Sequence, residues 1–242
     1  MWQTIISIDK NYVREYEFII GSLNKINGLA YAPYDTKSRH HINIAANEED
    51  LKTVKVGVNR IITDTVLIYI KYSYLTKNIH FNEESYLNSA LISALVYCDR
   101  NHETMLVENI LNDVYEYSID ALFKFRMGEL KSNWDEVIML VNGLIHSNHT
   151  PNDIYSLIQF ILEMSDDKKS LLKISRGDNE SIVIENITSD KKIDIPKLSE
   201  RDHTNIISAI ISANPYEIQL EKELLNNEMI NVVNNIVRLK TI

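Results

Sequence analysis

The chain has 242 residues, 45% of them hydrophobic and 24% charged, a balance that is typical of a globular protein and excludes a disordered or fibrous one. This length is enough to bury a substantial core in one large domain or two small ones. The formal net charge of −9 disfavours generic binding to a nucleic-acid backbone, which needs a concentrated basic surface.

Cysteine content and targeting signals indicate a cytoplasmic protein. Cys98 is the only cysteine, which excludes an internal disulfide framework and a multi-cysteine metal site. No basic segment precedes the apolar residues at the start of the chain, so we expect no secretory signal. The apolar stretch Val66–Leu75 is interrupted by Lys71 and is shorter than the roughly 20 apolar residues that cross a bilayer, so we expect no membrane span.

The first 47 residues predict a small β-α-β unit. Thr4–Ile8 is rich in β-branched residues and is followed by a turn, and Tyr12–Lys25 has apolar residues at helical spacing. Turn chemistry around Pro33 then leads to His41–Ala45, which alternates like a second strand.

Residues 48–168 predict a helical middle. Asn47 is a suitable N-cap for a long helix over Glu48–Lys77, and Asn82 begins another that reaches Cys98. Pro151 opens a helix to Met164.

Between these helices, Glu103–Ile145 predicts the central helix of the fold. Its apolar residues recur at three- and four-residue steps on more than one side, which is typical of a helix wrapped by other elements. Gly128 and Ser132-Asn133 are weak points where a kink or a break can fall.

Residues 169–242 predict a C-terminal α/β unit. Leu171–Ser175, Ser181–Ile187 and Lys192–Ile195 are short segments separated by hairpin turns. A helix from Ser199 to Ala213, a strand over Tyr216–Leu220, a helix over Asn227–Asn235 and a strand over Ile236–Ile242 follow, and two strands joined through a helix pair most readily in parallel. The sequence as a whole predicts an α+β fold with three parts, 1–47, 48–168 and 169–242.

Three segments together resemble the YtxC-like family of sporulation proteins. Ala121–Leu130 is similar to the family's helix with an apolar-x-Phe-Arg core, Leu171–Ile195 has its hairpin character, and Ser199–Leu220 is similar to its late helix, proline and strand. The resemblance covers roughly Val54 to Ile242, and this chain departs from the family pattern at Gly128 and at His146–Pro151. It implies a cytoplasmic, sporulation-associated context, and the family supplies no agreed activity or catalytic residues.

The strongest candidate for a binding residue is Arg126, beside Phe125 and one turn before Glu129. A guanidinium in an apolar helical row must find a partner or reach water. An ion pair that fixes helix packing and an anion-binding role are both open interpretations of Arg126, and the first is the commoner case.

A metal site is the weaker candidate. His146 and His149 are three residues apart, with Asp153 nearby as a third ligand, although Thr150-Pro151 favours a loop and paired histidines are usually surface residues. Glu116 and Asp120 are carboxylates at i, i+4 spacing, more typical of solvated acids than of a metal site.

The chain contains no nucleophile elbow, P-loop, dinucleotide glycine pattern or zincin signature. We therefore expect a non-enzymatic protein-interaction or regulatory module with a protein partner and no cofactor. The alternative is a small metal-dependent hydrolase or phosphotransfer enzyme assembled from dispersed acids and histidines. A deep pocket with converging polar side chains would favour the enzyme, and a flat exposed apolar patch would favour the binding module.

Overall fold

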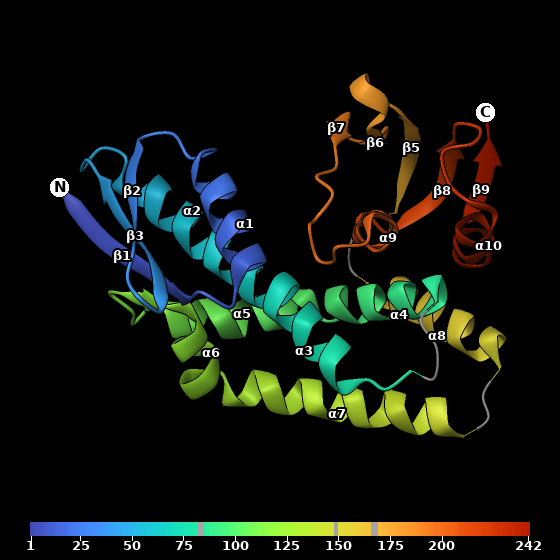
Figure 1. Ribbon diagram of the computed structural model, residues 1–242, viewed down its shortest axis with the longest axis horizontal. Helices are drawn as coiled ribbons and strands as arrows, with labels where there is room; N and C mark the ends of the chain where they lie inside the picture. The colour runs from blue at the N-terminus through green and yellow to red at the C-terminus, as the bar shows by residue number, and fades with distance from the viewer. Residues whose placement is uncertain (82–84, 148–149, 166–168) are drawn as a thin grey trace. The chain divides into compact units, whose positions relative to one another are not determined.

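The computed structural model describes residues 1–81, 85–147, 150–165 and 169–242 (Figure 1). Its helices and two mixed sheets confirm the α+β fold. The chain forms two compact units, each built from two separate stretches: unit 1 from Met1–Tyr74 and Arg100–Met139, and unit 2 from Leu75–Asp99 and Leu140–Ile242. These limits differ from the divisions at residues 47 and 168 that the sequence suggests.

Unit 1 contains a four-stranded sheet in the order β2-β3-β1-β4. The first three strands are antiparallel neighbours, whereas β4 pairs in parallel with β1 through Ile6–Tyr117 and Ser7–Ser118. The elements of this unit are β1 (Trp2–Asp9), α1 (Val13–Leu23), β2 (Leu29–Asp35), β3 (Arg39–Ala46), α2 (Leu51–Asp64), a π-helical segment (Thr65–Ile70), the start of α3 (Lys71–Asn78), α5 (Arg100–Leu111), β4 (Tyr117–Ser118), α6 (Ile119–Arg126) and the first part of α7 (Gly128–His146).

One face of this sheet is covered and the other is open. Along β1 the side chains of Thr4, Ile6 and Ile8 are buried, because alternate residues of a strand point to the same face. Ile42 and Ile44 of β3 lie on that face too, and together they form one core with the buried residues of α1 and α2. Figure 1 shows both helices on that side of the sheet.

A buried ion pair lies in the helical part of unit 1. Lys71 and Glu103 are each only 4% exposed, and the Lys71 Nζ donates to both carboxylate oxygens, at 2.7 and 2.8 Å. The Trp134 indole Nε1 donates to the same carboxylate at 2.7 Å. Lys71 directly follows the π-helical segment, and π-turns within helices often occur at functional sites.

Unit 2 is built around α4 (Tyr86–Tyr97), in which every residue from Ala90 to Val96 is buried. Ser85 caps this helix by accepting from the Asn88 N–H. Helix α4 contacts α8, α9 and α10, and Ser89 is hydrogen-bonded to Thr204 of α9. Its five-stranded sheet has the order β7-β6-β5-β8-β9. The other elements are α8 (Pro151–Met164), β5 (Ser170–Arg176), a 3₁₀ turn (Asp178–Glu180), β6 (Ile182–Asn186), β7 (Lys191–Lys192), α9 (Asp202–Ser212), β8 (Pro215–Leu220), α10 (Asn227–Ile236) and β9 (Arg238–Thr241).

Several sequence predictions for unit 2 are confirmed. The hairpin of β5 and β6 forms, and β8 and β9, which are joined through α10, pair in parallel. Helix α8 has the predicted limits, and Thr150 and Asp153 form a capping box at its start. None of the helices in the described part of the chain combines the length and apolar composition that crossing a bilayer requires.

The predicted central helix over Glu103–Ile145 is wrong. The chain leaves α5 after Leu111, passes through a turn and β4, and restarts as α6, and a further break at Met127 separates α6 from α7. Strand pairing of Tyr117 with Ile6, together with a hydrogen bond from Thr4 Oγ1 to the Tyr115 carbonyl, overrides the local helical spacing. The described helices with a fully buried middle are instead α4, over Ala90–Val96, and α9, over Thr204–Ile211.

Two details near the N-terminus also differ. Strand β2 was expected to be only a turn around Pro33, but it pairs along its length with β3. Proline is tolerated there because β2 is an edge strand, which does not need every N–H for pairing. Helix α2 begins after Asp50 and not after Asn47.

Breaking the buried ion pair should be strongly destabilising. We expect Lys71→Met to lower the free energy of unfolding by about 3–5 kcal/mol, because Glu103 would remain buried without its cation. Urea denaturation measures this change. Arg60→Met is the matched control, since Arg60 is 83% exposed and its pair with Asp64, which also binds Arg100, should contribute less than about 1 kcal/mol. Equal effects of the two substitutions would contradict the importance of the buried pair.

Candidate functional site

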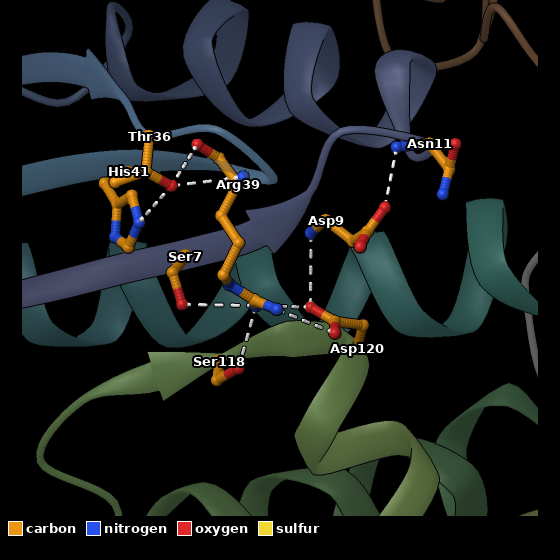
Figure 2. Close-up of polar contacts among 8 residues, drawn as sticks. All are labelled: Ser7, Asp9, Asn11, Thr36, Arg39, His41, Ser118 and Asp120. Carbon is orange, nitrogen blue, oxygen red and sulfur yellow. Dashed lines mark hydrogen bonds and ion pairs between the residues drawn. The ribbon is translucent and has the colours of Figure 1, made fainter.

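A polar network that spans four elements of unit 1 surrounds Arg39 and Asp120 (Figure 2). Arg39, the first residue of β3, donates to Asp120 of α6 through Nη1 at 3.0 Å and through Nη2 at 2.5 Å. The same Nη2 lies 2.9 Å from Ser118 Oγ and 3.3 Å from Ser7 Oγ. One guanidinium therefore joins β1, β3, β4 and α6. Such bidentate pairs are the stronger class of charge-assisted hydrogen bond.

Local turns position both partners of this pair. Thr36 and Arg39 are joined by backbone and side-chain hydrogen bonds that close the turn between β2 and β3. At the end of β1, the Asp9 N–H donates to Asp120 Oδ1 at 3.3 Å, and the Asp9 carboxylate accepts from the Asn11 N–H at 2.9 Å. The start of α6 is thereby fixed beside the end of β1.

The environment of Asp120 lowers the pKa of its carboxyl group. Burial raises this pKa, but the hydrogen bonds and positive charge of Arg39, with the N–H groups of Asp120 and Asp9, outweigh burial and bring it below the usual 3.8. The same contact raises the pKa of the Arg39 guanidinium. The pair is therefore ionised at neutral pH.

A shallow hollow of about 480 Å³, called here the strand-end hollow, lies where β1 and β4 end and where α1 and α6 begin. Its walls combine carboxylates, lysines and aromatic rings. The lining residues are Asp9, Asn11, Tyr12, Tyr74, Asp120, Phe123, Lys124 and Lys131.

The aromatic wall of the strand-end hollow rests on the buried ion pair. The Phe123 ring stacks on Trp134 with centroids 5.6 Å apart, and Tyr74 meets Phe123 edge-on at 6.0 Å. Trp134 is held in turn by its hydrogen bond to Glu103. The Tyr74 hydroxyl donates to Asp135 at 2.6 Å, and burial together with this bond raises the pKa of Tyr74 to about 12. The rings are therefore held in place before any ligand arrives.

A second surface is the uncovered side of the sheet, called here the open sheet face. A hollow of about 700 Å³ lies over it, and among the described residues that line this hollow only Glu116 is charged. Tyr115, 90% exposed, stands at its rim. The outward side chains of the open sheet face form three rows, each with one residue from β2, one from β3 and one from β1. The rows are Ala30, Ala45 and Gln3; Ala32, Asn43 and Ile5; and Tyr34, His41 and Ser7.

The binding residues predicted from sequence lie on the surface, at the end of α6 and the start of α7. Phe125 is 73% exposed, and Arg126 and Glu129 are exposed as well. Arg126 therefore reaches water, and in the part of the chain that the structure describes no ion pair joins it to Glu129. The predicted burial of this segment is wrong because Phe125 and Arg126 end a short surface helix.

Two of the three predicted metal ligands lie in the described residues. His146 is exposed at the end of α7, and Asp153 caps α8 by accepting from Thr150, whereas His149 lies outside the described residues. Among the residues described, no three His, Cys, Asp or Glu side chains gather to hold a metal. Glu116 and Asp120 do not share a helix, since β4 separates them.

The two adjacent histidines at the start of β3 face opposite sides of the sheet. His40 stacks on Tyr16 and is hydrogen-bonded to Asp35 at 2.8 Å. His41 stacks on Tyr34 at the open sheet face. Their contacts are those of packed aromatic residues.

Comparison of the chain with protein-family profiles, with curated proteins and with solved structures finds no match. The candidate surfaces therefore rest on geometry alone. Sequence reasoning noted Asp120 as a solvated acid and missed Arg39, which is 81 residues away. Only the pairing of β1 with both β3 and β4 brings these residues together.

The Arg39–Asp120 pair should make stability depend on pH. The pKa of the Asp120 carboxyl group is lower in the folded chain than in the unfolded chain. The contribution of the ionised carboxylate to the free energy of unfolding is therefore complete well above pH 3.8, and it is lost as the pH falls through the pKa of the folded state. We expect Asp120→Asn to lower the free energy of unfolding by about 1–3 kcal/mol at pH 7, and the difference from wild type to shrink below pH ~4.

Urea denaturation of both proteins at pH 7, 4 and 3 provides the measurement. Asp113→Asn is the matched control, because Asp113 is an exposed carboxylate in the turn before β4. A difference between wild type and Asp120→Asn that stayed constant across this pH range would contradict the assignment.

Proposed function

We propose that this chain is a non-enzymatic protein-interaction module of the cytoplasm and that the open sheet face of unit 1 is its binding surface. The sporulation context is part of the proposal and is supported only by the resemblance to YtxC-like proteins. The partner is a protein that covers β2, β3 and β1.

This proposal rests on the lack of charged side chains among the outward residues at the centre of the open sheet face. In a chain of net charge −9, its outward side chains around Ala30, Ala32 and Ala45 are small or uncharged. Tyr34, 44% exposed, and Tyr115 flank them. Protein interfaces are depleted of charged residues at their centre and enriched in aromatic residues, which matches this composition.

The shape of the face supports the same class of function. Alanines on neighbouring strands leave a shallow hollow over a rigid sheet, into which a partner's larger side chain can fit. The hydrogen-bonded ladder of β1, β2 and β3 holds this hollow without a partner, so little ordering is needed on binding.

A site-specific photo-crosslinker tests the proposal. With the crosslinking residue at Ala32, we expect a discrete covalent adduct with one protein species in cells entering sporulation. The matched control carries the crosslinker at Lys52, an exposed residue of α2 in the helical layer. Analysis by gel shift and peptide mass spectrometry identifies the adduct.

Ala30→Glu placed beside the crosslinker should remove the adduct, because a carboxylate would be desolvated at the centre of the interface. Circular dichroism confirms that each variant folds. The same adducts from Ala32 and Lys52, or none from Ala32, would refute the open sheet face as the binding surface.

A further inference from the structure

The strand-end hollow differs in character from the open sheet face. It is lined by four charged residues and three aromatic ones, whereas the face is nearly uncharged. Nothing in the proposed interaction through the face uses these groups. We infer that the strand-end hollow binds a nucleoside monophosphate, with the base on the Tyr74–Phe123 wall and the phosphate on Lys124 and Lys131.

The location of the hollow supports a ligand site. In α/β sheets, ligands bind in the crevice beyond the carboxyl ends of parallel strands, where the following helices begin. Strands β1 and β4 are parallel neighbours, β1 ends at Asp9 and leads to α1, and β4 ends at Ser118 and leads to α6. The hollow lies at these two ends, and its volume of about 480 Å³ is in the usual range for small-molecule pockets.

The charges favour an anionic group. Asp120 is already neutralised by Arg39. Lys124 and Lys131 form no ion pair with any residue that the structure describes, and their Nζ atoms lie only near rings, at 5.1 Å from the Phe125 centroid and 5.8 Å from the Phe123 centroid. Two lysines without an ion pair in the described structure therefore line the hollow together with Asp9 and the already paired Asp120. A phosphate can accept hydrogen bonds from both lysines.

The rings and the remaining polar groups define the rest of the ligand. Phe123 and Tyr74 are held by Trp134 and Asp135 with their ring planes 79° apart, so a planar base can stack on the free face of one of the two rings at little entropic cost. Asp9 accepts and Asn11 can both donate and accept, which suits the hydroxyl groups of a sugar. A nucleoside monophosphate carries these three parts in one small molecule.

Titration of the full ¹⁵N-labelled chain with AMP, followed by NMR, tests the inference. We expect saturable shifts confined to the backbone amides of residues 9–12 and 120–131, with a Kd below about 1 mM. Lys131→Ala should weaken binding roughly tenfold, because one charge-assisted hydrogen bond is lost, and Lys131→Arg should restore most of it. Lys52→Ala, which changes an exposed lysine of α2, is the matched control and should leave the Kd unchanged.

Inorganic phosphate and adenosine serve as partial probes, and each should bind more weakly than AMP. Phosphate binding as tight as that of AMP would refute the role of the ring platform. Binding of oligothymidylate without binding of AMP would make the hollow a single-strand site and overturn the inference. No saturable shift at these residues with AMP would overturn it as well, while leaving the crosslinking result at Ala32 unaffected.

Discussion

The ion pair between Arg39 and Asp120 is the constraint on which unit 1 depends. It joins residues 81 positions apart, and the same guanidinium reaches hydroxyl groups on β1 and β4. Strand β4 has only two residues, too few for its backbone pairing alone to hold the segment beside β1. The ion pair therefore acts with the Thr4–Tyr115 hydrogen bond and the burial of Ile119 to fix β4 and α6. These two elements form one edge of the open sheet face and one wall of the strand-end hollow.

A second ion pair supports the same region from inside. Lys71 and Glu103 are buried and hold Trp134, which in turn supports Phe123 and the aromatic wall. Buried ion pairs are weak evidence for stability, because desolvation offsets much of their attraction, and positioning is often their better-attested role. We interpret the polar contacts of unit 1 as two ion pairs that act together. The pair at the strand ends is about one quarter exposed and the other is buried, and both hold rings and charges in a fixed arrangement.

The sequence predicted those elements whose signals are local. The hairpin of β5 and β6, the capped start of α8 and the strand-helix-strand run at the C-terminus each have turn or capping residues at their ends. The region from Leu111 to Arg126 was mispredicted because its apolar spacing continues through β4, and only contacts with β1 reveal the break. Arg39 and Asp120 carry no local signal of their pairing, so the candidate site was not predictable from one sequence.

Hydrogen exchange of the Arg39→Gln variant tests this account most directly. If the ion pair holds β4 and α6 against β1, the amides of residues 117–122 should exchange faster in the variant than in wild type, because local opening would cost less free energy. The amides of α4, which belong to unit 2, should exchange at unchanged rates. Unchanged protection of residues 117–122 in the variant would contradict the claim that this pair organises unit 1.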